Sequence, residues 1–303
     1  MKRILTFLLT NFVAVLTLTF IAELVCRFCG TSVGELIGGE GLMPLFIFAF
    51  IFGMAGALIS LMLSKTIVKV SMKCKTIDGS EGEAEKWLVT TVADLAQRAG
   101  VKMPEVAIYP GEANAFATGM RRNAALVAVS TRIMEQMSRE ELRAVLAHEM
   151  SHVSNGDMVT MCLTQGVVNT FVIFFSHLLA GVIRVAASNG KERDRRGGGG
   201  YFLYHMCVQL FQVLFGILAA MVVMWYSRRR EYAADAGSAK LLGSPFPMIA
   251  ALRRLGNLEP GVLPDSIKAF GIAGGRTSLF ASHPSLEDRI NALTNLPPDF
   301  MMK

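Results

Sequence analysis

The chain has 303 residues, of which 52% are hydrophobic and only 18% are charged, and its formal net charge is +6. Soluble domains average about 45–50% apolar and about 25% charged residues, so this composition excludes a disordered chain and disfavours an ordinary soluble fold. Five cysteines in this length exclude a small disulfide scaffold. In so apolar a chain, the positive charge indicates loops beside anionic lipid and not a nucleic-acid-binding surface.

Four apolar stretches are long enough to cross a bilayer as helices, for which about 20 residues suffice. They cover residues 4–25, 42–63, 158–183 and 201–226. The last two carry polar side chains, among them Gln165, Asn169 and His177, which we expect to form hydrogen bonds between helices. Whether these two stretches cross the bilayer completely stays open.

These stretches divide the chain into four parts. We expect two N-terminal transmembrane helices in 1–63, a first catalytic segment in 64–157, a hydrophobic helical hairpin in 158–226 and a second catalytic segment in 227–303. The apolar run after Lys2 and Arg3 is too long for a signal peptide and lacks a small-residue cleavage site, so it predicts an uncleaved anchor. A disulfide between Cys26 and Cys29 and two free thiols are both compatible with the sequence.

The distribution of lysine and arginine predicts the orientation. Basic residues precede the first apolar stretch, follow the second at 65–75 and follow the fourth at 228–230. Positive charge accumulates in cytoplasmic loops, so both catalytic segments are predicted to face the cytoplasm. The loop 188–200 conflicts with this assignment, since it carries four basic residues against two acids.

The segment 64–157 predicts a small mixed domain. Apolar residues at helical spacing predict a helix over 83–98, and a short strand is expected at 106–109. Strands 114–118 and 124–129 flank a glycine-containing turn and predict a hairpin. A capping box from Ser138 to Glu141 starts a helix that ends near Ser154, before Asn155 and Gly156. The predicted fold class is α+β: four transmembrane helices with a cytoplasmic, mainly helical, zincin-like domain that carries a small β-hairpin sheet.

The capped helix contains the sequence HEMSH, an H-E-x-x-H motif formed by His148, Glu149 and His152. Residues four apart lie on one helix face, so the two imidazoles can bind a single Zn²⁺. Glu149 flanks this face and can act as a general base on a water activated by the metal. Two solvated histidines on a surface helix are the alternative, which the apolar segment before His148 disfavours.

A catalytic zinc ion needs a third protein ligand. Glu231 and Asp235 follow the fourth apolar stretch and lie four residues apart, hence on one face of a helix expected to begin near Ser227. Glu231 is the predicted third ligand, and Asp235 can orient a ligating histidine. The alternative for these two acidic residues is a solvent-exposed acidic helix face without metal. His283 is the competing candidate for the third ligand.

The order of these motifs resembles the HtpX family of bacterial membrane zinc metalloproteases, which is related to the CAAX-prenyl proteases. The resemblance rests on HEMSH at 148–152, EYAAD at 231–235 and the two apolar segments between them. It extends to NAFATG at 114–119 and to SHPS at 282–285, which Arg289 follows. It implies one zinc ion per chain, location in the bacterial inner membrane, and cleavage of misfolded membrane proteins on the cytoplasmic side.

Three further residues are candidates for contacts with the substrate. The strand 114–118, with Asn114 and Phe116, could pair with the backbone of an extended peptide, unless it is an internal strand of the hairpin. His283 could hydrogen-bond the oxyanion that develops during peptide cleavage, or simply begin a helix before Pro284.

Three other functions compete with broad quality control. One is a processing protease for a narrow substrate class such as lipidated tails. Another is a catalytically silent membrane scaffold stabilised by zinc, which the presence of Glu149 disfavours. A third is a transporter, which would need ionisable groups at mid-membrane, where only His177 qualifies. Substrates, cleavage preference and oligomeric state do not follow from the sequence.

Overall fold

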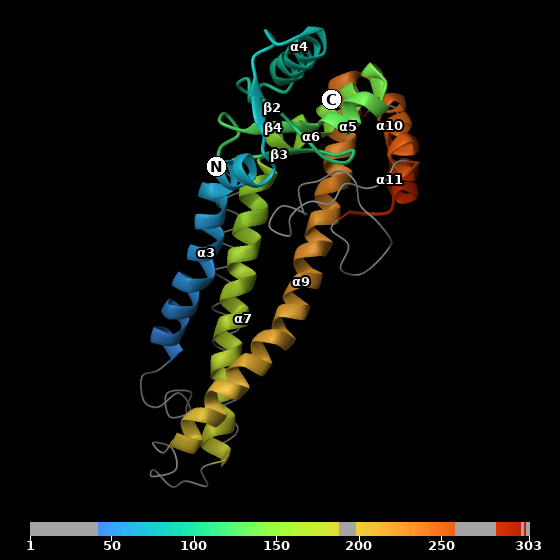
Figure 1. Ribbon diagram of the computed structural model, residues 1–303. Helices are drawn as coiled ribbons and strands as arrows, with labels where there is room; N and C mark the ends of the chain where they lie inside the picture. The colour runs from blue at the N-terminus through green and yellow to red at the C-terminus, as the bar shows by residue number, and fades with distance from the viewer. Residues whose placement is uncertain (1–41, 188–197, 258–282, 298–299, 301–303) are drawn as a thin grey trace. The chain divides into compact units, whose positions relative to one another are not determined.

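The computed structural model describes residues 42–187, 198–257, 283–297 and 300 (Figure 1). The predicted first span, residues 4–25, and the pair Cys26 and Cys29 lie outside the described residues. The described part is mainly helical, with one four-stranded sheet. Its contacts form two compact units, one within Met1–Leu58 and Cys162–Val223 and the other within Ile59–Met161 and Met224–Lys303.

Three helices of the described part are long and apolar enough to cross a membrane. They are α3 (Leu42–Ser71), α7 (Asp157–Ala187) and α9 (Gly198–Leu242). At about 1.5 Å per residue each exceeds the roughly 30 Å of a hydrocarbon core. The helix expected to begin near Ser227 is instead the last part of α9, because no glycine or proline interrupts the chain between Tyr226 and Leu242 except Gly237.

Within the first unit, α3 packs against α7 through small and aromatic residues. Ala49 is fully buried against Phe174 and Leu178. Gly53 lies against the backbone of α7, since a Cβ atom there would be only 2.5 Å from the Thr170 nitrogen. On α3 and α9, large apolar side chains such as Phe52 remain exposed, as expected for surfaces that face lipid.

Polar side chains of the apolar helices are largely paired. His177 Nδ1 lies 2.7 Å from the Tyr204 hydroxyl, which joins α7 to α9 as the sequence predicted for this histidine. Gln165 instead donates to Asn169 on the same helix, at 2.8 Å. This pair therefore hydrogen-bonds within α7, since residues four apart on a helix already lie side by side.

The sheet of the second unit has the strand order β1-β2-β4-β3. The strands are β1 (Lys75–Ile77), β2 (Glu105–Tyr109), β3 (Ala115–Thr118) and β4 (Leu126–Ser130). The predicted hairpin is confirmed, as β3 and β4 pair antiparallel. Gly119 permits its turn, because the residue has φ +136° and a Cβ atom would lie 3.0 Å from Ala125 Cα. The parallel pairing of β2 with β4 leaves β3 at one edge.

Among its described residues, this unit has five helices besides the ends of α3, α7 and α9, and two of the five were predicted. The predicted pair are α4 (Glu83–Arg98) and α6 (Arg139–Asn155), and the others are α5 (Thr131–Gln136), α10 (Phe246–Gly256) and α11 (Leu286–Thr294). Helix α6 contacts β3, α4 and α10, and α10 in turn contacts α11. This central position makes α6 the buried helix that the sequence predicted.

Candidate metal centre

Helix α6 is fixed at both ends. Ser138 and Glu141 form the predicted capping box, with each side chain accepting a hydrogen bond from the other residue's backbone N–H. At the other end Gly156 adopts the left-handed conformation, with φ 70°, so the chain turns sharply before α7 begins at Asp157. Ten residues of α6 are buried, including His148 and Glu149.

The two histidines of α6 meet Glu231 of α9. The Nε2 atoms of His148 and His152 lie 3.1 Å apart, and Glu231 Oε1 lies 3.2 Å from His152 Nε2. The other carboxylate oxygen of Glu231 is 3.6 Å from His148 Nε2. One ligand atom from each residue lies within 4.8 Å of the others, so these three predicted ligands converge on a point where one metal ion could sit.

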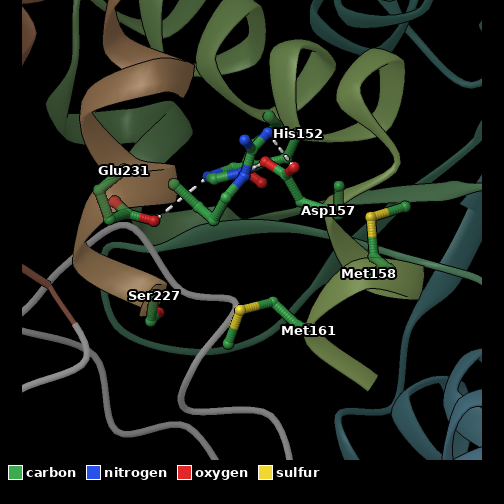
Figure 2. A pocket seen from close by; sticks show the side chains of 9 residues that line it. His152, Asp157, Met158, Met161, Ser227 and Glu231 are labelled. Carbon is green, nitrogen blue, oxygen red and sulfur yellow. Dashed lines mark hydrogen bonds and ion pairs between the residues drawn. The ribbon is translucent and has the colours of Figure 1, made fainter. Parts of the chain in front are cut away.

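The opposite nitrogen of each imidazole faces a carboxylate. His148 Nδ1 lies 2.9 Å from Asp235 Oδ1. His152 Nδ1 lies 2.7 Å from Asp157 Oδ2 (Figure 2). A carboxylate accepts the Nδ1–H hydrogen and so leaves Nε2 with its lone pair for a metal. Two lone pairs facing each other at 3.1 Å beside a carboxylate form a poor set without a cation, and the donor set therefore fits a divalent metal.

Acidic and basic side chains alternate around this centre. Arg289 of α11 is wholly buried and donates to both oxygens of Asp235, at 2.7 Å and 2.8 Å. Its Nη1 atom also lies 3.5 Å from Glu231. The hydrogen bonds from His152 to Asp157 and Glu231 outweigh burial and raise the pKa of His152 to about 10, a value for the protein without its metal.

Glu149 lines a small pocket beside the three ligand side chains. Burial raises the pKa of the Glu149 carboxyl to about 7, although the charges of His148 and His152 oppose the shift. The pocket has a volume of about 20 Å³, which suffices for one water molecule. The residues around it come from α6, α7, α9 and β3: Ala117, Glu149, His152, Asp157, Met158, Met161, Ser227, Arg230 and Glu231 (Figure 2).

His283 lies next to the third predicted ligand. Its Nδ1 atom is 2.9 Å from Glu231 Oε2, and its side chain is buried. The Nε2 atom has no hydrogen-bond partner among the described residues. The structure thus brings His283 to the centre, as the sequence suggested, without including it in the ligand set formed by the two histidines of α6 and Glu231.

Asn114 and Phe116 lie at the β3 edge of the sheet but point to different surroundings. The Asn114 backbone nitrogen donates to the Ser130 hydroxyl at 3.0 Å, which fixes the start of β3 against β4. The Phe116 ring is fully buried in the core of the sheet, with its centroid 5.4 Å from that of Tyr109. Ala117 of β3 lines the pocket beside the metal centre.

Sequence reasoning missed Asp157 and Arg230. Asp157 follows His152 by five residues, beyond the face of α6, and only the sharp turn at Gly156 brings it back to the imidazole. An aspartate directly after a predicted helix stop was the available signal. The sequence pattern assigns Arg230 only to the basic triplet 228–230 that predicts the membrane orientation, whereas in the structure Arg230 forms an ion pair with Asp157.

Comparisons with known proteins identify the family of this chain. The sequence profile of Peptidase family M48 matches residues 83–296. "Protease HtpX homolog" of Janthinobacterium sp. (strain Marseille) is 47% identical over 300 residues, covering 98% of this chain and 100% of the relative. "Protease HtpX" of Chromohalobacter salexigens is 49% identical over 302 residues, covering 97% and 98%.

A solved structure shares the fold. The crystal structure of S. mikatae Ste24p superposes with a TM-score of 0.57 at 20% identity, covering 95% of this chain and 67% of that chain. The family match covers most of the chain, and the HtpX proteases match it over nearly the full length. The chain therefore belongs to peptidase family M48, among the HtpX metalloproteases of membranes.

Proposed function

We propose that this protein is a zinc-dependent endopeptidase of the bacterial inner membrane, which cleaves misfolded or damaged membrane proteins on the cytoplasmic side. The observation that carries the proposal is the convergence of His148, His152 and Glu231 beside the buried carboxyl group of Glu149. Two imidazoles and one carboxylate are a common ligand set of catalytic zinc, which keeps one position open for water or substrate.

In this proposal His148, His152 and Glu231 hold the zinc ion through the two Nε2 atoms and the carboxylate. Zinc bound there would polarise the scissile carbonyl and lower the pKa of a water molecule. Glu149 takes a proton from the attacking water and returns it to the leaving amine. Its position beside a pocket large enough for one water molecule supports this role.

Other side chains would orient the reactants. With Nδ1 facing Glu231, the Nε2 atom of His283 could donate to the developing oxyanion in the imidazolium form, which carries a hydrogen on both nitrogens. Strand β3 is an edge strand, and an extended peptide could pair with such an edge. In this arrangement Asn114 and Phe116 would position the strand, and Ala117 would lie nearest the scissile bond.

The link to membrane substrates rests on α9. Glu231 follows the apolar stretch 201–226 on one uninterrupted helix, which places it about 8 Å along the axis beyond that stretch. A protease whose metal-ligating Glu231 lies so close to the membrane-embedded stretch would act on chain segments that emerge from the bilayer. The orientation toward the cytoplasm is supported by the basic residues at 65–75 and 228–230.

The proposal is tested with the full chain purified in detergent. Zinc content near one per chain, together with cleavage of an unfolded membrane protein, is expected; a chelator should stop cleavage and added zinc should restore it. Cleavage of a lipidated peptide but not of unfolded membrane proteins would replace quality control by dedicated processing. Zinc retention without any cleavage would instead support a silent scaffold.

A further inference from the structure

Two consecutive arginines at the end of the apolar part of α9, Arg229 and Arg230, lie in different environments. The Arg229 guanidinium lies over the ring of Trp225, 4.6 Å from its centroid. Arg230 turns by about 100° on the helix and pairs with Asp157. The Arg230 side chain is only 21% exposed and that of Asp157 only 6%. Of these two neighbours, only Arg230 belongs to the surroundings of the metal centre.

Asp157 uses both of its oxygens. Oδ1 pairs with Nη2 of Arg230, while Oδ2 lies 2.7 Å from Nδ1 of His152. The far nitrogen of the same imidazole, Nε2, is the atom that meets Glu231 at 3.2 Å. A continuous polar chain thus runs from Arg230 through Asp157 and His152 to the predicted metal position.

The second imidazole has a chain of the same kind. His148 Nδ1 faces Asp235, whose two oxygens accept from Arg289. The two rings differ in burial, since the His148 side chain is 1% exposed and that of His152 is 16% exposed. His152 therefore has less surrounding packing to hold its orientation and depends more on its hydrogen bond to Asp157.

We propose that Arg230 is a positioning residue for the metal centre. Through Asp157 it holds the His152 ring with Nε2 directed at the ligand position, and it joins the start of α7 to the helix turn that carries Glu231. A buried carboxylate that loses its cation is destabilised in that position, so Asp157 would shift without Arg230. Such a shift would weaken the hydrogen bond that His152 Nδ1 makes to Asp157. Orienting partners of this kind are typically worth about 10–100-fold in metal affinity or activity.

The variant Arg230→Gln tests this role, with Arg229→Gln as the matched control. Both remove one positive charge from neighbouring positions of α9, but only the first removes the partner of Asp157. Zinc affinity is measured by competition with a chromophoric chelator, and the visible spectrum of the cobalt-loaded protein reports the ligand geometry. We expect Arg230→Gln to bind zinc about 10–100-fold more weakly and to alter the cobalt spectrum. Arg229→Gln should match the wild type in both, and Arg230→Lys should recover part of the affinity.

Two further measurements keep the inference separable from folding and from the proposed function. Thermal unfolding with chelator present identifies any variant that is merely misfolded. The pair Asp157→Asn and Arg230→Gln should be non-additive, because both act through one hydrogen bond to His152. The inference rests on the proposed zinc site: a wild type that binds no zinc refutes that function. Wild-type zinc affinity and cobalt spectrum in a folded Arg230→Gln variant refute only the role of Arg230.

Discussion

His148 Nδ1 lies 2.9 Å from Asp235 Oδ1, although 87 positions and two apolar helices separate the residues in the chain. This contact joins the H-E-x-x-H helix to the helix of the third predicted ligand. Arg289 of α11 completes the contact, so the final helix also supports the centre. The metal site is thus built from segments that are distant in the sequence, so single substitutions can test the role of each residue separately.

The ligand assignment predicts different zinc contents for three variants. Glu231→Ala removes a ligand and should leave a desalting column without metal. Asp235→Ala keeps the three ligands but removes the partner of His148 Nδ1 and of the buried Arg289, so it should retain some zinc, with affinity lower by about 10–100-fold. His283→Ala should keep zinc. Full zinc in Glu231→Ala together with its loss in His283→Ala would show that the third ligand is His283.

Phe116 is expected to act through stability and not through substrate contact. Its side chain is fully buried, so Phe116→Ala should lower the free energy of unfolding by about 3–5 kcal/mol. Phe116→Leu should cost less and leave KM for a peptide substrate unchanged. Chemical denaturation and peptide kinetics on the two variants measure both quantities. A raised KM in Phe116→Leu at unchanged stability would mean that the ring contacts substrate.

Glu149 should make the metal-free protein less stable as the pH rises. Burial raises its folded-state pKa from 4.5 to about 7, so the unfolded chain releases this proton first. The contribution is absent below about pH 4.5, grows between these two values and is complete above about pH 7. Glu149→Gln, in the presence of chelator, should therefore melt at a higher temperature than the wild type at pH 8.

The two proteins should converge toward pH 5 in the same thermal scans. Glu135→Gln, at an exposed position, serves as the control and should follow the wild type throughout. A Glu149→Gln variant that is no more stable than the wild type at pH 8 would contradict the unfavourable burial of this charge.

Both catalytic segments are predicted to lie in the cytoplasm. In a variant without its own cysteines, Ser80→Cys and Asn295→Cys should resist a membrane-impermeant thiol reagent added to intact cells, and should react after the cells are opened. The two positions must behave alike, because their segments build one centre around His148 and Arg289. Labelling of both positions from outside would contradict the cytoplasmic orientation that the lysine and arginine distribution predicts.

The sequence predicted local features well and tertiary contacts poorly. The capping box at Ser138 and the hairpin around Gly119 follow from short-range rules, and both are confirmed. The parallel pairing of β2 with β4 depends on how the sheet assembles, which no local pattern encodes. In the sequence, Asp157 and Arg230 resemble ordinary charged residues at helix ends. They pair with each other only because the fold brings α7 and α9 together beside α6.

The central claim is that Glu149 transfers the proton in a zinc-dependent cleavage. The most direct measurement compares proteolysis by the wild type and by Glu149→Gln at equal zinc content, in detergent and with the same unfolded membrane-protein substrate. Because Gln keeps the shape of the side chain but cannot accept the proton, turnover should fall by at least about 10²–10⁴-fold while zinc and fold are retained. Turnover near that of the wild type, at matched zinc, would contradict the account.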